Sequence, residues 1–423
     1  MSVILPKEIA YNQTLPSLPP DVVNTSVVLA PVNGSSFGEN SLLQWDLPQR
    51  GFLDPNSLYI RYKFAISGGA ASTEMKGTPV FTPFVKLETI FGSSIVESIQ
   101  NYGQLQNMLA NVTLNDSQKD GLSCAYGWTD YATATEAGNL NGKSFTNAAE
   151  SAMFAGPLNC ILSSAEKLIP LGIMPNVRIQ LTVDSISNIF TNTVAFPTTI
   201  ALTNVELCFD MIDFGGAVDN IVKGMGEKVY IKSQSWTSTG NTLASGVSGT
   251  VELMYNQRLS SIKSLFTNFG GAFATSLNKQ YDSYDVTSSN GSLQYNIAGT
   301  MYPTREVSTA NNKAAFIMEL KQAVGGIHSL ATNNFSISPG EFTIVGIGST
   351  TYRIPAKFWF GVNCEKLSTS GSLLTGVSTM NSAISLRINL GTATPGAYNV
   401  QLICLYDALI EIDTVTRNAT VKQ

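Results

Sequence analysis

The chain has 423 residues, of which 43% are hydrophobic and only 13% are charged, and its formal net charge is −5. This length suits two domains of roughly 200 residues, and a charged fraction about half of the roughly 25% in typical domains indicates a subunit that buries much of its exterior in an assembly. Lys7 and Arg50 are the only basic residues among the first 50, which excludes a basic N-terminal arm that neutralises nucleic-acid phosphates.

The first segment, residues 1 to 28, carries Pro16, Pro19 and Pro20 among short apolar runs without a sustained period. Such a segment predicts an extended N-terminal arm that lies on a neighbouring copy or under the subunit. Strand-like stretches begin at its end, at Ser26–Pro31 and Leu42–Leu47.

The run from Trp45 to Ile66 predicts two strands joined by a turn. Asp54-Pro55-Asn56-Ser57 is turn chemistry, because proline presets its backbone and the short polar side chains bond nearby amides. After the turn, Leu58, Ile60, Tyr62 and Phe64 alternate with polar or charged residues. This period of two predicts a half-buried strand of an antiparallel sheet.

A helix is predicted from Glu97 to Asn111, because apolar residues recur there at spacings of three and four. Ser94 lies three residues before Glu97, so the pair is a candidate capping box at the start of this helix. Gly103 weakens the prediction, since glycine is unfavourable inside a helix. The segments 113 to 157 and 267 to 292 are predicted to be long excursions between strands, and loops of that length usually have a function.

The ends of the two halves of the chain resemble each other. The first half closes with the alternating strands Met174–Val183 and Ile200–Asp210, and the second closes with Ala383–Leu390 and Asn399–Asp407. In each pair the first strand carries one arginine, Arg178 or Arg387, and the second ends in an aspartate. A repeat at a spacing of roughly 200 residues indicates two fused copies of one domain. The glycine-rich passage 214 to 228 is the best linker between them.

Many short strands with regular turns and sparse helix predict an all-β protein. We expect two tandem eight-stranded jelly-roll β-sandwiches, a double jelly roll, with a few short helices. The predicted divisions are an N-terminal arm over 1–28, a first jelly roll over 29–216, a second over 217–413 and a C-terminal tail over 414–423.

The cysteines are five and widely scattered, and none has the CxxC or Cys/His spacing of a zinc site. Cys208 and Cys404 sit in apolar strand-like runs, where a free cysteine acts as a small core residue. The pattern fits a reducing compartment. The N-terminus lacks the basic and apolar regions of a signal peptide, and no apolar run approaches 18 residues, so we expect no transmembrane helix.

The sequence predicts no enzyme, no cofactor and no metal site. Its single histidine, His328, is interpreted as a turn residue, because no G-x-S-x-G elbow accompanies it. Asp282 and Asp285, together with Asp210 and Asp213, offer oxygen ligands for calcium, but they lack EF-hand spacing and are better interpreted as solvated acids. Phe358-Trp359-Phe360 is predicted to be a core strand rather than a platform for stacked bases.

Several segments, in this order, resemble major capsid proteins of the double jelly-roll type found in the PRD1, adenovirus and Polinton-like virus lineage. The opening run resembles the start of their first jelly roll, and Gly92–Leu109 resembles the strand and helix that follow it. The other similar segments are Leu168-Ile169-Pro170 with the strand Val177–Val183, Arg258–Phe266, Tyr302-Pro303 and Leu405–Ile412. The chain is short for this lineage, which suggests trimmed tower loops.

The resemblance implies a viral major capsid protein whose pseudo-hexameric homotrimers tile an icosahedral shell around the genome. It implies a virion location after assembly inside the host cell, and contacts with penton and minor capsid proteins. It leaves contact with an internal membrane open and includes no sequence-specific binding of nucleic acid. Two alternatives remain: a secreted or surface β-sandwich adhesin or lectin-like protein, and a β-sandwich glycoside hydrolase with a carboxylate pair.

Overall fold

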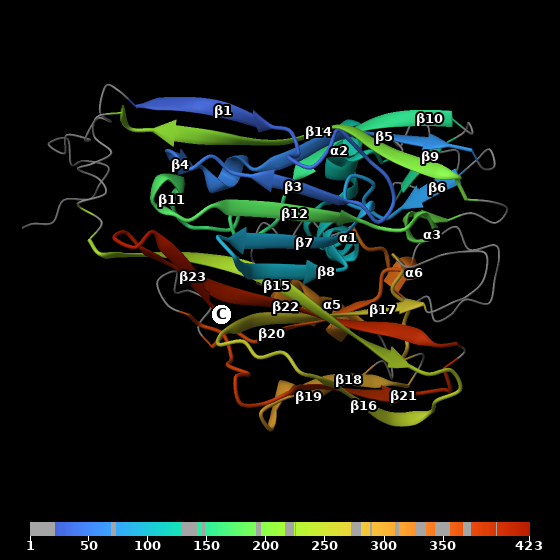
Figure 1. Cartoon of the computed structure of the whole chain (residues 1–423). Helices are drawn as coiled ribbons and strands as arrows, with labels where there is room; N and C mark the ends of the chain where they lie inside the picture. The colour runs from blue at the N-terminus through green and yellow to red at the C-terminus, as the bar shows by residue number, and fades with distance from the viewer. Residues whose placement is uncertain are drawn as a thin grey trace, which may run out of the picture.

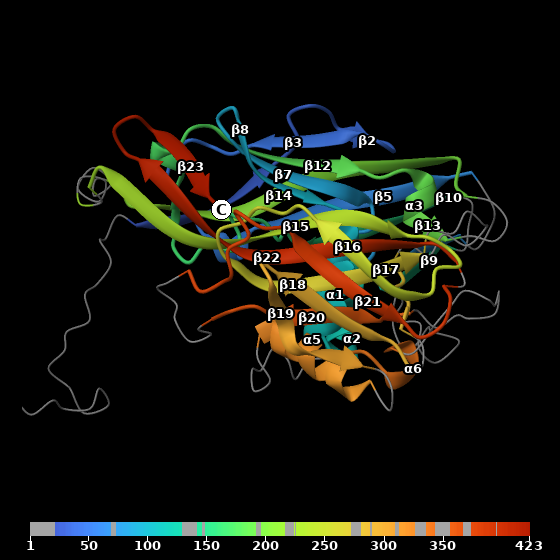
Figure 2. The same cartoon turned by 90° about the horizontal axis from the view of Figure 1, so that it is seen from below.

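The structure, a computed structural model, describes residues 22–68, 73–128, 142–145, 149–191, 196–215, 224, 226–271, 281–287, 290–308, 313–325, 336–342, 356–366, 374–394 and 396–423. The strands of both halves run roughly along one axis, with the first half above the second in Figure 1. A view from below shows the same common direction (Figure 2). In the described part of the chain, every pair of named strands is antiparallel.

The first jelly roll consists of two main sheets. One has the order β1 (Val23–Leu29), β14 (Thr199–Asp213), β5 (Tyr59–Ser67) and β10 (Ala149–Pro157), with the short strands β2 (Ser36–Phe37), β4 (Phe52–Leu53) and β11 (Ile169–Pro170) attached. The other has the order β3 (Leu42–Asp46), β12 (Val177–Val183), β7 (Phe84–Phe91) and β8 (Ser94–Gln100). A small third sheet contains β13 (Phe190–Thr191), β6 (Thr73–Lys76) and β9 (Gly142–Phe145).

The second jelly roll also has two sheets. One has the order β15 (Lys228–Leu243), β22 (Tyr398–Asp413), β17 (Ile262–Gly271) and β20 (Trp359–Asn363), and β23 (Asn418–Lys422) pairs with β22. The other has the order β16 (Gly249–Tyr255), β21 (Ile384–Leu390), β18 (Ser292–Ile297) and β19 (Thr300–Ser308).

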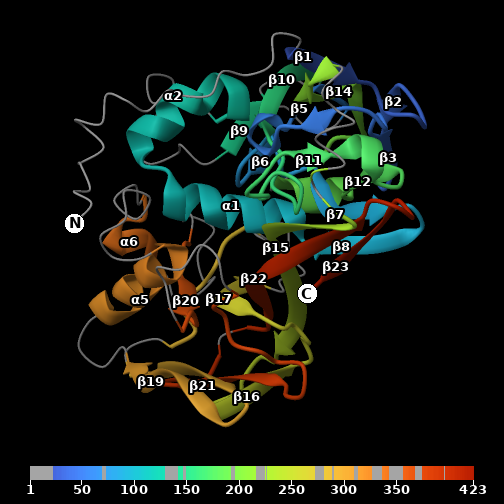
Figure 3. The same cartoon turned by 90° about the vertical axis from the view of Figure 1, so that its left-hand side faces the viewer.

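The helices are few and lie between strands. They are α1 (Tyr102–Thr113), α2 (Asp116–Tyr126), α3 (Ile186–Ile189), α5 (Ala314–Gly325), α6 (Pro339–Phe342) and the 3-10 turns Pro55–Ser57 and Leu171–Ile173. Seen along the strands, α1, α2, α5 and α6 all lie on the left-hand side of the molecule (Figure 3). These helices, which come from both rolls, therefore lie on the same side of the molecule.

The two rolls have the same strand order. Taken along the chain, the equivalent strands are β1 and β15, β3 and β16, β5 and β17, β7 and β18, β8 and β19, β10 and β20, β12 and β21, and β14 and β22. The helices α1 and α2 follow β8, and α5 follows the equivalent β19. The resemblance between the ends of the two halves is confirmed, because Arg178 lies in β12 and Arg387 in the equivalent β21.

The turn and strand predicted from the opening run are confirmed. The Asp54 side chain accepts a hydrogen bond from the Asn56 amide at 3.0 Å, as an Asx turn requires. In β5, Ile60, Tyr62 and Phe64 are buried while the residues between them are partly exposed. The period of two thus places one face of β5 in the core.

The predicted start of the helix was wrong. Residues 94–100, including both members of the expected capping box, form β8 and pair with β7 across a turn at Gly92, whose φ is +61°. The helix begins only at Tyr102, after Asn101 in the left-handed region with φ +52°. Pairing with β7 satisfies the backbone of 94–100, so the helical spacing of its apolar residues does not decide its conformation.

Both rolls extend beyond the predicted divisions. Residues 23–28 of the expected N-terminal arm belong to β1, which pairs with β14 over its whole length. The expected C-terminal tail contains β23, which pairs with β22 from Leu409 to Asp413. The expected excursion 113 to 157 contains α2, β9 and β10 rather than loop alone. Residues 1–21, most of the predicted linker and residues 272–280 lie outside the described residues.

Candidate assembly site at the joint between the two jelly rolls

The two jelly rolls meet along a joint, which we define by β8, α1 and residues 158–166 of the first roll and by β15, Tyr281 and Ser336 of the second. Strands β8 and β15 are in contact, and Figure 3 shows them next to each other in the middle of the molecule. Buried apolar residues of both rolls belong to one continuous cluster. The joint is therefore part of the protein's interior.

Serines of β15 connect the second roll to the first. The Ser233 hydroxyl donates to the Ile161 carbonyl at 2.5 Å, and the Ser238 hydroxyl donates to the Gln100 carbonyl at 2.6 Å. Ser235, which is fully buried, donates to the carboxylate of Glu97. Hydrogen bonds of this kind satisfy polar groups that would otherwise be costly to bury.

Glu97 is the acidic residue at the centre of these contacts, and it is only 2% exposed. Its Oε2 accepts from the Thr89 hydroxyl at 2.8 Å and from the Ile161 amide at 3.0 Å. Burial raises the pKa of Glu97 to about 6, and the three hydrogen bonds limit that rise because they favour the charged form. The sequence pattern predicted that this residue belongs to a helix cap, and no local signal indicated its place in the joint.

Tyr281 inserts between the rolls beside α1. Its hydroxyl donates to the Thr82 carbonyl at 2.9 Å, and its own carbonyl accepts from the Asn107 side chain at 3.3 Å. A Cβ on Gly103 would stand 2.8 Å from that hydroxyl and 2.8 Å from the Phe81 carbonyl oxygen. The glycine that weakened the helix prediction is therefore required for the close approach of α1 to its neighbours.

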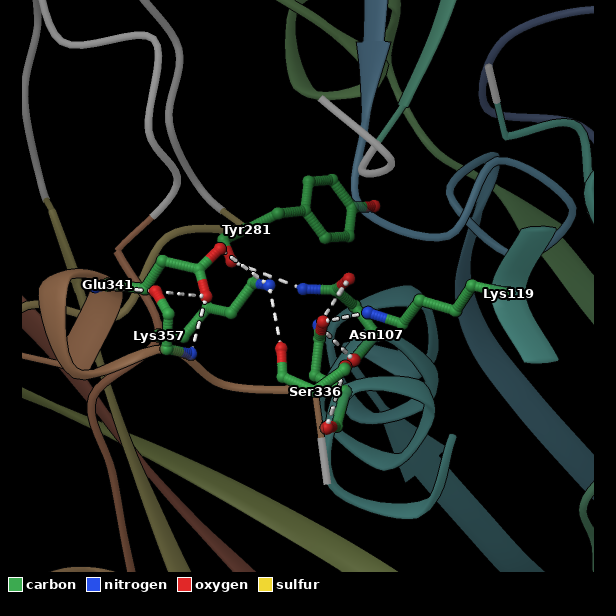
Figure 4. A network of polar contacts seen from close by, with 8 residues as sticks. Asn107, Lys119, Tyr281, Ser336, Glu341 and Lys357 are labelled. Atoms are coloured by element: carbon green, nitrogen blue, oxygen red, sulfur yellow. Dashed lines mark hydrogen bonds and ion pairs between the residues drawn. The ribbon is translucent and has the colours of Figure 1, made fainter. Parts of the chain in front are cut away.

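A buried polar network continues from α1 into both rolls (Figure 4). Lys119 of α2 donates to the Asn111 side chain at 2.5 Å, and the Asn111 carbonyl accepts from the Ser336 amide at 3.2 Å. Lys119 is 1% exposed, and burial lowers its pKa to about 7. An ammonium group is poorly stabilised so far from water.

Lys357 and Glu341 form an ion pair at the other end of this network, with 2.7 Å between Nζ and Oε1. Lys357 also donates to the Ser336 carbonyl at 3.3 Å, and Glu341 accepts from the Ser338 amide at 2.9 Å. Both side chains are mostly buried. These contacts hold the 336–342 segment to Lys357 within the second roll, and the hydrogen bonds from Ser336 to the Asn111 carbonyl join that segment to the first roll.

The acids considered for calcium do not form a shared site. Asp285 is fully buried and ion-paired with Lys313, so its interpretation as a solvated acid was wrong. Asp213 accepts from the Gly215 amide at the end of β14, in the other roll. Within the described part of the chain, no three His, Cys, Asp or Glu residues gather as metal ligands.

The other candidate residues have ordinary places. His328 lies outside the described residues. Phe358, Trp359 and Phe360 are all buried, which confirms the predicted core strand. All five cysteines are free thiols, and Cys208 and Cys404 are buried as predicted. Among the described helices, none is long and apolar enough to span a membrane.

No protein-family model matches the chain, and no curated protein sequence matches it either. Several solved structures, however, match nearly the whole chain. The Faustovirus major capsid protein has a TM-score of 0.65 at 10% identity and covers 96% of this chain and 92% of its own. VP54 of PBCV-1, in a structure fitted into a reconstruction of the virophage Sputnik, has a TM-score of 0.64 at 10% identity and covers 98% and 99%. The mavirus major capsid protein has a TM-score of 0.54 at 7% identity and covers 100% and 95%. This chain therefore has the double jelly-roll fold of viral major capsid proteins.

Proposed function

We propose that this chain is a viral major capsid protein that assembles as pseudo-hexameric homotrimers and tiles an icosahedral shell around the genome. The observation that carries the proposal is the presence of two rolls with one strand order in a single chain. Three such chains supply six similar units, so a threefold object fills a site of sixfold shape. The role is structural rather than enzymatic, as in the capsid proteins that share the fold.

The joint also suggests which surfaces meet between copies. Inside the chain, β8 of the first roll contacts β15 of the second. Their equivalents, β19 and β1, are largely exposed strands. Val28 on β1 is 48% exposed, and Met301 on β19 is 36% exposed. We expect β19 of one copy to pack against β1 of the next, in a heterologous contact that closes after three copies.

In this function the protein is located in the virion after assembly inside the host cell. Its partners are other copies of itself, with penton and minor capsid proteins at the edges of the lattice. The N-terminal segment before β1 is expected to hold neighbouring subunits together. Sequence-specific contact with nucleic acid is not part of this proposal, because the chain carries a net charge of −5.

Negative-stain electron microscopy of the purified protein tests the proposal. Trimers with a six-sided outline, or shells tiled with them, are expected, whereas single monomers would contradict it. The variant Val28→Glu places a charge in the expected contact and should give folded monomers, because a buried unpaired charge is costly. Met254→Glu is the matched control: Met254 is 58% exposed on β16, outside that contact, and trimers should persist.

A further inference from the structure

Glu97 is a buried carboxylate that three neutral groups hold between two jelly rolls. Thr89 of β7 and the Ile161 amide come from the first roll, and Ser235 of β15 comes from the second. Among the described residues, no lysine or arginine pairs with it. Burying a charged carboxylate without a cation carries a desolvation cost. A neutral glutamine of nearly the same shape would avoid that cost.

We propose that Glu97 is a proton-binding group that strengthens the joint in mild acid and weakens it as the surroundings become neutral. The proposal concerns contacts inside one chain, so it does not depend on the proposed assembly. It assigns to this chain a response to pH that the shared fold does not require.

Among the described titratable groups around Glu97, only Glu97 itself changes charge between mildly acidic and neutral pH. Tyr102 of α1 and Tyr406 of β22 face it, and burial raises the pKa of both. Cys160 faces it from the segment after β10, and burial raises the pKa of this thiol to about 12. All three stay neutral in mild acid and at neutral pH. Tyr406 and Ser235 also hydrogen-bond to each other, which extends the contacts of Glu97 into β22.

The direction of the effect follows from the shift. The pKa of Glu97 is raised from 4.5 to about 6 on folding, so the folded chain binds a proton more tightly than the unfolded chain. The stabilisation is therefore complete below about pH 4.5 and is lost as the pH rises through about 6. Between about pH 5 and about pH 7.5, the unfolding equilibrium constant should increase about eightfold through this group alone.

Equilibrium unfolding of the full-length protein in urea, at one protein concentration, tests the inference. Wild type and Glu97→Gln are compared across this pH range. Taking the ratio of their unfolding constants removes the contributions of the other titrating groups, which both proteins share. The ratio of the two unfolding constants should change about eightfold. A ratio that stays constant with pH would overturn the proposal.

Two further variants keep the test decisive. Glu88→Gln removes a glutamate of β7 that is paired with Lys86, and this variant should keep the pH response of the wild type. Ser235→Ala removes one donor to the carboxylate, so the midpoint of the response should move to higher pH. If Glu97→Gln does not fold, Ser235→Ala decides: an unchanged midpoint would contradict the role of Glu97.

Discussion

The two jelly rolls share a strand order but differ in what covers their equivalent strands. Strand β8 of the first roll lies against the second roll, whereas its equivalent β19 is largely exposed. Likewise β15 lies in the joint, whereas its equivalent β1 has five exposed residues out of seven. One contact between rolls, that of β8 with β15, is thus made within the chain. The equivalent strands β19 and β1 remain largely exposed.

The cores of the two rolls also differ in their side chains. In the first roll, Phe64 packs among Phe145, Phe154 and Phe190, each with its ring centroid 6.1 Å away. In the second, Phe360 stacks on Tyr295 at 5.0 Å. Phe64 lies on β5 and Phe360 on β20, which are not equivalent strands, so the same strand order accommodates different aromatic packing in the two cores. The alternation of apolar and polar residues places each strand, and the local volume decides which side chain fills the core.

The largest expected effect tests whether the joint couples the rolls. Phe64→Ala in the first roll and Phe360→Ala in the second should each cost about 3–5 kcal/mol, because each leaves a cavity in a packed core. If the joint makes the chain one cooperative unit, both variants lower the midpoint of the same single unfolding transition. Two separate transitions, each sensitive to one variant, would show that the rolls unfold independently.

A smaller effect is expected at the Lys357–Glu341 pair in the joint network. Lys357→Met leaves the Glu341 carboxylate buried without its cation and should cost about 3 kcal/mol of unfolding free energy. The double variant with Glu341→Gln should recover part of this loss. Arg61→Ala breaks a pair on the first roll whose side chains are 44% and 34% exposed, and solvent screens this pair, so the loss of stability should be far smaller than in Lys357→Met. Equal losses of unfolding free energy in Lys357→Met and Arg61→Ala would contradict the burial of the Lys357–Glu341 pair.

A third effect, smaller than the loss expected for Lys357→Met, is a pH dependence opposite in sign to that of Glu97. Burial lowers the pKa of Lys119 from 10.5 to about 7, so the unfolded chain binds more protons between these values. Stability from this group should rise with pH in that range, by about 2 kcal/mol between about pH 7 and about pH 9. Lys119→Met should lose this rise, which urea unfolding of both proteins measures. Parallel pH profiles for the two proteins would show that Lys119 does not carry the effect.

The sequence by itself determined the fold class and many of the strands. Alternation identified β5, β12 and β21, and short polar side chains around Pro55 identified the turn before β5. These signals are local, because a strand with one buried face must repeat every two residues. The resemblance between the ends of the halves also pointed to two copies of one domain.

Only the tertiary structure decided the roles that depend on distant partners. Residues 94–100 have helical spacing, yet pairing with β7 makes them a strand and carries Glu97 to Ser235, 138 positions away. Asp285 looks like a loop acid, but the fold buries it beside Lys313. Gly103 looks like a weak point of a helix, but the packing of Tyr281 requires it. Such contacts join segments far apart in the chain, and no local pattern encodes which segments meet.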